Sequence, residues 1–231
     1  MPGVTVYAYM TYPVVAAFGR AWLERGTITA RFHLPFYDGD TVTVSAAAIE
    51  PDTLDLTATN DEGAVCATAR ASLSVAHARP DPAGYPPSPL PTSPVPATPV
   101  ALGSLGVLGS LESGFHADRG PSFLGQLDDD LPLYRRERLA HPGWLLRKAN
   151  DILIANVRLG PWVHTGSTIT NFDAVADGDR VATRARVSEL FTRRNHEFVE
   201  LDVLLLVNGD RPVAQIRHSA IYQLREPSVP T

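Results

Sequence analysis

The sequence of 231 residues contains a single cysteine, Cys66, so no disulfide bond can form within the chain. Scarcity of cysteine fits a reducing compartment. The first residues lack a basic stretch followed by an apolar run, so we expect no signal peptide and a cytoplasmic location. No apolar run reaches the roughly 20 residues that a membrane-spanning helix needs, so no membrane span is expected.

An excess of positive charge is also missing. The chain has 20 Lys and Arg against 25 Asp and Glu, and the net charge of -5 argues against a nucleic-acid partner. The glycine patterns typical of dinucleotide and phosphate binding are absent, as is a Gly-x-Ser-x-Gly nucleophile motif. The histidines and the cysteine do not have metal-ligand spacing, so we expect neither a metal nor a resident cofactor.

What the sequence does contain is one pattern stated twice. Residues 27–32 and the turn at 38–40 near the N-terminus are echoed by residues 168–172 and the turn at 177–179. Each copy follows an apolar run with helical spacing. A repeat has to be considered before any other feature, and two copies are too few for a solenoid. The sequence therefore predicts a pair of related units.

Each unit is predicted to contain one long helix and a set of antiparallel strands. Because each helix is apolar on most sides, we expect the sheet to wrap around it. The expected elements of the first unit are a strand at 4–7, a helix at 12–24, and strands at 27–34, 41–49, 54–59 and 64–75. Those of the second unit are a helix at 141–157 and strands at 162–172, 180–191, 197–207 and 212–224.

Prolines divide the two units. Residues 76–101 contain Pro80, Pro82, Pro86, Pro87, Pro89, Pro91, Pro94, Pro96 and Pro99, which exclude a central strand or helix. We therefore expect an N-terminal unit at 1–75, an extended connector at 76–101 and a C-terminal unit at 102–231. Recognition of the connector by a proline-binding domain is an alternative.

This α+β layout resembles the hotdog fold, in which a curved antiparallel sheet wraps one long helix. Two copies on one chain resemble the double-hotdog branch of the MaoC-like enoyl-acyl hydratases and dehydratases. The resemblance covers most of the chain outside the connector. It is carried by the repeat, by Pro35 with the turn at 38–40, and by His141-Pro142-Gly143 at the start of the second helix.

The MaoC-like hydratases carry the motif Asp-x-Asn-Pro-x-His just before their helix. In this chain the motif falls on residues 129–134: Asp129 and Pro132 match, Leu131 replaces Asn, and Tyr134 replaces His. The resemblance implies that Asp129 acts as acid or base when water adds to an enoyl thioester. Tyrosine has an ordinary pKa of about 10, so Tyr134 suits the role of acid or hydrogen-bond donor. A solvated acidic turn is the alternative.

Two further elements complete the expected catalytic set. His164, in the strand after the second helix, is the candidate to replace the missing motif histidine; a packed structural histidine is the alternative. The family aims a backbone N–H at the thioester carbonyl from the helix start. His141 and Gly143 occupy that place here, so the resemblance implies that they bind substrate, with Gly143 donating. A plain helix start with proline at its first position is the alternative.

The resemblance implies an acyl-thioester hydratase or dehydratase whose substrate is an enoyl or 3-hydroxyacyl group on coenzyme A or an acyl-carrier protein. Arg135 and Arg136 would meet the carrier's phosphates, or lie on a solvated surface. Two other functions stay open. One is a non-catalytic acyl-binding or partner-binding hotdog, and the other is a hotdog thioesterase using Asp151 or Glu24. Dimers of such units are common in the family, so a homodimer is one expected assembly.

Overall fold

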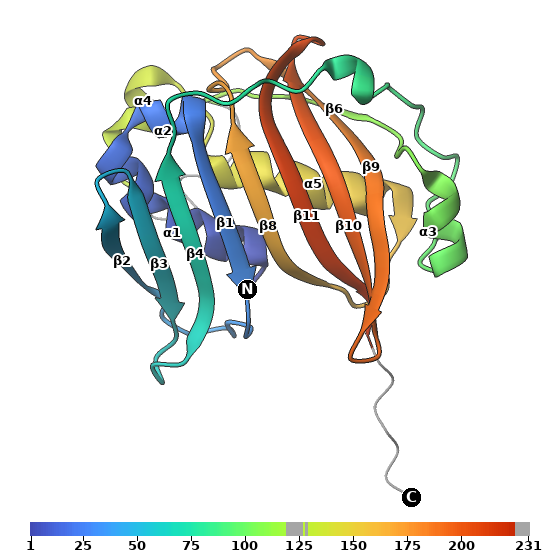
Figure 1. Ribbon diagram of the computed structural model, residues 1–231, viewed down its shortest axis with the longest axis horizontal. Coiled ribbons are helices and arrows are strands. Elements are labelled where there is room, and N and C mark those ends of the chain that lie inside the picture. Colours follow the sequence, from blue (N-terminus) through green and yellow to red (C-terminus); the bar gives the residue numbers. More distant parts are fainter. Residues whose placement is uncertain (119–126, 128, 225–231) are drawn as a thin grey trace, which may run out of the picture.

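The computed structural model describes residues 1–118, 127 and 129–224. One sheet of nine antiparallel strands dominates it, in the order β2-β3-β4-β1-β8-β11-β10-β9-β6 (Figure 1). The strands are β1 (Gly26–Phe32), β2 (Thr43–Glu50), β3 (Thr53–Thr59), β4 (Val65–Leu73), β6 (Leu111–Gly114), β8 (Val163–Asn171), β9 (Arg180–Arg193), β10 (His196–Val207) and β11 (Arg211–Gln223). The helices are α1 (Gly3–Phe18), α2 (Arg20–Arg25), α3 (Pro99–Leu105), α4 (Pro132–Glu137) and α5 (Pro142–Asn156). Strands β5 (Val95–Pro96) and β7 (Val157–Arg158) form a separate parallel pair.

The two repeats meet at the centre of the sheet. Identical Thr-Ile-Thr triplets of β1 and β8 pair antiparallel, with Ile28 opposite Ile169 and Thr29 opposite Thr168. The Oγ1 atoms of these two threonines lie 3.1 Å apart. A pseudo-two-fold axis therefore passes between the two isoleucines, and it relates α1 to α5 and the strands β1–β4 to β8–β11. This is the predicted double hotdog fold.

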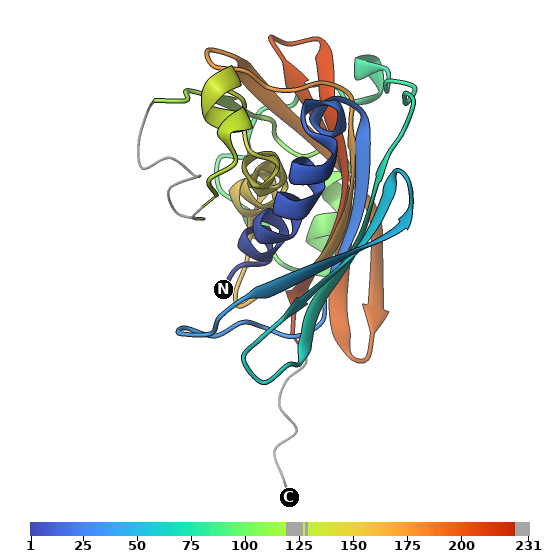
Figure 2. The ribbon, with the colours of Figure 1, turned by 90° about the vertical axis from the view of Figure 1, so that its left-hand side faces the viewer.

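Helices α1 and α5 pack against each other on one face of the sheet, which curves around them (Figures 1 and 2). Met10 and Val14 of α1, and Leu146 and Ile152 of α5, are fully buried. Burying each of these side chains stabilises the fold by about 1.5–3 kcal/mol. Among the described residues, no helix has the length and apolar character needed to cross a membrane.

The strand predicted at residues 4–7 was wrong. These residues form the first turns of α1, and Val4, Val6 and Tyr7 are buried there. Valine, threonine and tyrosine favour strands only weakly, and burial of a helix against a sheet and a second helix overrides that preference. By contrast, the helix predicted at 141–157 and the eight other predicted strands lie within a few residues of α5, β1–β4 and β8–β11.

The segment between the repeats crosses the outer face of the second one. Its elements are short: a 3₁₀ turn at Pro82–Gly84, β5, and the start of α3. The ring of Tyr85 packs with Leu204 and Leu206 of β10 on the outer face of the sheet. The residues that alternate with them along β10 belong to the main core, on the side of the helices. The Tyr85 hydroxyl donates to Asp202 Oδ2 at 2.7 Å. This contact explains why successive residues of β10 are buried on both faces of the sheet.

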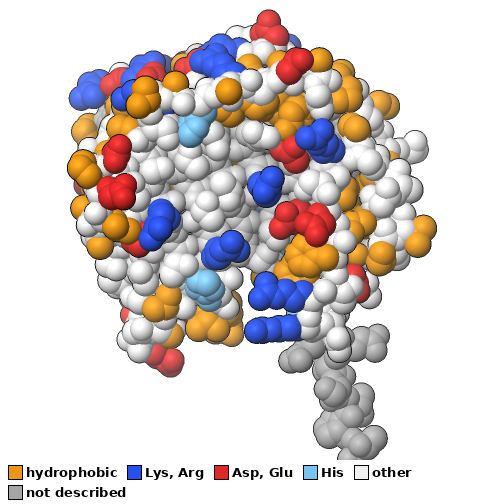
Figure 3. Space-filling view, viewed as in Figure 1, with side chains coloured by type: hydrophobic (Ala, Val, Ile, Leu, Met, Phe, Trp, Pro, Cys, Tyr) orange, Lys and Arg blue, Asp and Glu red, His pale blue; other side chains and the backbone are white. Residues whose placement is uncertain are grey.

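The outer face of the first repeat is polar and is not covered by any segment that the structure describes (Figure 3). A shallow hollow of about 580 Å³ lies there over β1, β3 and β4, with Thr29, Arg31 and Thr57 in its lining. Asp55 and Arg70 form a two-pronged ion pair across it, at 2.6 and 2.8 Å. The two repeats thus differ on their outer faces while sharing one layer of helices inside.

Candidate active site

Asp129 and His141 form a buried pair at the start of α5. Asp129 is 5% exposed and His141 2% exposed. The Oδ1 atom of Asp129 accepts a hydrogen bond from Leu131 N–H at 2.9 Å, just before α4 begins. Its Oδ2 atom lies 3.2 Å from His141 Nε2. The short helix α4 lies between the two residues in sequence, and the turn after it brings them back together.

The position of His141 fixes the direction of its hydrogen bonds. It is the N-cap of α5, and its Nδ1 atom accepts the Gly143 N–H at 3.0 Å. A neutral imidazole with an acceptor at Nδ1 carries its proton on Nε2. His141 therefore donates that proton to Asp129. Burial lowers the pKa of His141, and the hydrogen bond to Asp129 opposes this effect.

Gly143 is placed at the helix start, as expected, but its N–H is used within the protein. It orients the His141 ring. An oxyanion role for Gly143 stays a prediction, and it requires this hydrogen bond to open when substrate binds. As the structure stands, the helix N-terminus, the imidazole and the carboxylate form one chain of donors and acceptors.

Tyr134 lies beside the pair. Its ring centroid is 4.9 Å from that of His141, and the side chain is 1% exposed. Its hydroxyl has no hydrogen-bond partner among the described residues. Burial, with a further contribution from the charge of Asp129, raises the pKa of Tyr134 far above its ordinary value. The phenol is therefore a neutral hydroxyl, able to donate a hydrogen bond and unsuited to act as a base.

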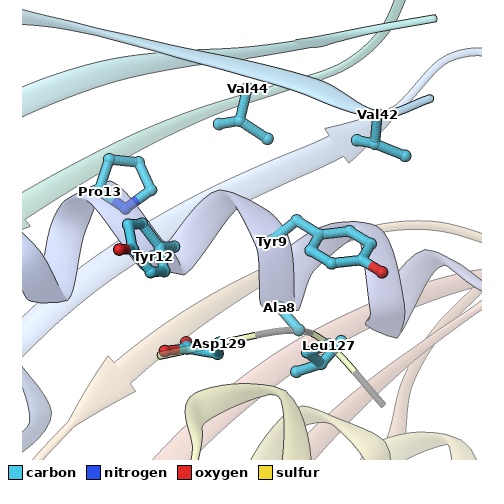
Figure 4. A pocket seen from close by; sticks show the side chains of 8 residues that line it. All are labelled: Ala8, Tyr9, Tyr12, Pro13, Val42, Val44, Leu127 and Asp129. Carbon is cyan, nitrogen blue, oxygen red and sulfur yellow. The ribbon is translucent and has the colours of Figure 1, made fainter. Parts of the chain in front are cut away.

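A cavity of about 420 Å³ opens beside Asp129, between α1 and β2 (Figure 4). The Tyr12 hydroxyl donates to Asp130 Oδ1 at 2.8 Å at its rim, which raises the pKa of Tyr12. Asp129 is the acidic residue in the described lining, and the walls are otherwise aliphatic or aromatic. The lining residues are Ala8, Tyr9, Tyr12, Pro13, Val42, Val44, Leu127 and Asp129.

The structure does not bring His164 to Asp129. The His164 ring contacts Phe32 and His218, and its Nε2 atom lies 2.9 Å from Ser167 Oγ. These contacts lie near Gly3, in the first turn of α1, whereas the cavity is lined by the middle of that helix. The expected contact between Asp129 and His164 is therefore not formed, and the histidine beside Asp129 is His141.

The remaining candidates lie outside this cavity. Arg135 and Arg136 are on the exposed side of α4, whose inner side carries Tyr134. Asp151 pairs with Lys148 at 3.3 Å, and Glu24 pairs with Arg20 at 2.6 Å. In the part of the chain that the structure describes, no cluster of three or more His, Cys, Asp or Glu could hold a metal ion.

The contact that sequence reasoning missed is the one between His141 and Asp129. We expected it to bind substrate, whereas its hydrogen-bond partner is Asp129. The family motif directs attention to position 134, five residues after Asp129. His141 is twelve residues away, and no spacing rule joins the two. The one usable signal was that a histidine at an N-cap has its ring close to the preceding loop.

Comparisons with solved structures agree with the fold. A conserved hypothetical protein from Mycobacterium tuberculosis with a double hotdog fold is 18% identical, with a TM-score of 0.64 over 96% of this chain and 81% of that one. A protein described as a MaoC domain dehydratase from Chloroflexus aurantiacus is 12% identical, with a TM-score of 0.60 over 97% and 82%.

A protein described as thioesterase II from Thermobifida fusca is 18% identical, with a TM-score of 0.53 over 97% of this chain and 87% of that one. No protein-family model and no curated protein sequence matches the chain. The chain is thus a double hotdog protein, a class that includes both dehydratases and thioesterases.

Proposed function

We propose that this protein is an acyl-thioester hydratase or dehydratase of MaoC-like type. The observation that carries the proposal is the buried Asp129–His141 pair, whose carboxylate also lines an apolar cavity. In this chain Tyr134 replaces the motif histidine, and the Asp129 carboxylate of the pair supplies an acid/base group. An enoyl or 3-hydroxyacyl group, on coenzyme A or an acyl-carrier protein, suits a cavity with aliphatic and aromatic walls and one acidic group.

One carboxylate is enough for the reaction. In hydration, Asp129 takes a proton from water as the oxygen bonds to C3 of the enoyl group, and the C2=C3 electrons move toward the thioester carbonyl. Asp129 then returns that proton to C2, so that H and OH add across the double bond. Dehydration is the reverse. General acid/base groups of this kind contribute about 10²–10⁴-fold to the rate.

The neighbours of Asp129 have supporting roles in this scheme. The Nε2–H of His141 and the N–H of Leu131 hold the carboxylate in place, each through one oxygen. The neutral hydroxyl of Tyr134 is a candidate donor to the substrate oxygen. Arg135 and Arg136, exposed on the same helix, are candidates to meet the phosphates of the carrier.

The test is turnover of short, medium and branched enoyl-coenzyme A substrates, followed as loss of the conjugated enoyl absorbance. Asp129→Asn should abolish hydration. Asp130→Asn is the matched control, since it removes a neighbouring exposed carboxylate that pairs with Tyr12. A thiol reagent in parallel reports thioester hydrolysis. Hydrolysis without hydration would replace the proposal by a thioesterase, and saturable binding with neither reaction would replace it by an acyl-binding protein.

A further inference from the structure

A second cavity, of about 500 Å³, lies at the N-terminal end of α1. Gly3 lines it. Tyr12, at the first cavity, is nine positions further along the helix, a distance of about 13.5 Å along the axis. The pseudo-two-fold axis between β1 and β8 relates the N-terminus of α1 to that of α5. The second cavity is therefore the counterpart, in the first repeat, of the region that holds Asp129 and His141.

Two polar side chains face this cavity with atoms left unpaired. Asn150, on α5, is 9% exposed, and His164, on β8, is 7% exposed. Both line the cavity. Asn150 Oδ1 and His164 Nδ1 have no hydrogen-bond partner among the described residues. A buried polar atom without a partner is unfavourable, and native structures contain few of them. Two such atoms on one cavity indicate a ligand that satisfies them.

Behind His164 lies a chain of hydrogen bonds. Its Nε2 atom is 2.9 Å from Ser167 Oγ, which is 3.1 Å from His218 Nδ1. The serine has one proton and can donate it to either ring. Burial lowers the pKa of His218 to about 3. Burial together with His218 lowers the pKa of His164 well below its ordinary value, although an interaction of the ring with the Gly166 backbone opposes this shift. Both rings are therefore neutral, and His164 Nδ1 can present either an acceptor or an N–H to the cavity.

The lining restricts what can bind. It contains no Asp, Glu, Lys or Arg side chain among the described residues, and its one described charged group, the Met1 ammonium, donates to the Phe36 carbonyl. Beside Asn150 and His164, an ionised group would therefore be buried with no charged side chain to compensate it. Phe32, Phe36 and Trp162 supply apolar walls. Gly3 leaves the imidazole open: a Cβ atom there would lie 2.9 Å from His164 Nδ1. The cavity suits a neutral apolar molecule with one oxygen group at its buried end.

We propose that this cavity binds a neutral acyl chain carrying one hydroxyl or carbonyl oxygen, which Asn150 and His164 hold. The site is distinct from the proposed catalytic pair and uses different residues. The structure assigns a binding site to each half, with an amide and an imidazole in place of the carboxylate.

The test is isothermal titration calorimetry with the N-acetylcysteamine thioester of 3-hydroxyoctanoate. The protein is the full chain carrying Asp129→Asn, so that turnover at the first cavity does not intervene. We expect saturable binding that weakens about tenfold or more in His164→Leu and in Asn150→Leu. The matched control, His116→Leu, changes an exposed histidine and should bind as the parent does. Octanoate, which is ionised, should bind at least tenfold more weakly than the thioester.

Absence of saturable binding would overturn the proposal. So would an isotherm that neither substitution changes, because binding of the probe at the first cavity is the same in all these variants. Circular dichroism checks that each variant is folded. If His164→Leu does not fold, Gly3→Ala replaces it, because the added methyl group would occupy the space beside His164 Nδ1 that Gly3 leaves open and should also weaken binding. A failure here leaves the hydration assay unaffected, because Asp129 and His141 are not part of this cavity.

Discussion

Acidification should destabilise this protein through its buried histidines, and His218 allows the effect to be calculated. His218 is fully buried, and burial lowers its pKa from 6.5 to about 3. In the unfolded chain His218 is protonated as the pH falls through 6.5, whereas in the folded protein it stays neutral until the pH approaches 3. The contribution of neutral His218 to the free energy of unfolding is therefore fully present above pH 6.5 and is lost as the pH falls below it. At pH 5, the loss from His218 alone is about 2 kcal/mol, at about 1.4 kcal/mol per pH unit.

The assay is urea unfolding at pH 8 and pH 5. In His218→Gln, the drop in free energy of unfolding between the two pH values should be smaller than in the wild type by about 2 kcal/mol. The substitution also relieves the effect of His218 on the pKa of His164, which acts in the same direction. His116→Gln, an exposed control, should keep the wild-type drop. A drop in His218→Gln equal to that of the wild type would refute the reasoning.

Three further predictions concern stability and use the same unfolding measurement. Leu146→Ala should cost about 2–5 kcal/mol, because it leaves a cavity where α5 meets the sheet; a cost below 1 kcal/mol would contradict the assigned core. Asn156 is fully buried and exchanges hydrogen bonds with both the N–H and the carbonyl of Gly109, at 2.7 and 2.9 Å. Asn156→Ala should therefore cost about 2 kcal/mol or more, and a neutral effect would mean that water replaces these bonds. Tyr134→Phe should leave stability unchanged or raise it by about 1 kcal/mol, because it removes a buried hydroxyl without a described partner; a clear loss would reveal a partner for that hydroxyl.

Much of the fold could be predicted because it depends on local patterns that are repeated. The alternation of apolar residues located eight strands of the sheet, and the repeat predicted that they form two related units. The turn glycines Gly39 and Gly178 adopt positive φ values of 90° and 88°, as equivalent positions of a repeat should. Residues 4–7 were misassigned because their conformation is decided by packing between the sheet and α5, which no local pattern reports. The two-residue strands β5 and β7 are too short to leave a pattern.

The candidate site was only partly predictable. Asp129 could be found because the motif is a linear spacing just before a helix. Its pairing with His141 depends on the turn of the chain through α4 and on the rotamer of an N-cap side chain. The grouping of His164, Ser167 and His218 depends on the register between β8 and β11, where Ser167 lies opposite His218. Such contacts follow from tertiary structure.

The central claim is that Asp129, held in place by His141, is the acid/base group that acts on an enoyl thioester. The most direct measurement is kcat/KM for enoyl-coenzyme A hydration in a double-mutant cycle of Asp129→Asn and His141→Gln, with all variants shown to be folded. We expect Asp129→Asn to lower kcat/KM by about 10²-fold or more. His141→Gln should lower it as well, and the double variant should be no worse than Asp129→Asn alone. Full activity in Asp129→Asn, or losses that simply multiply in the double variant, would contradict the account.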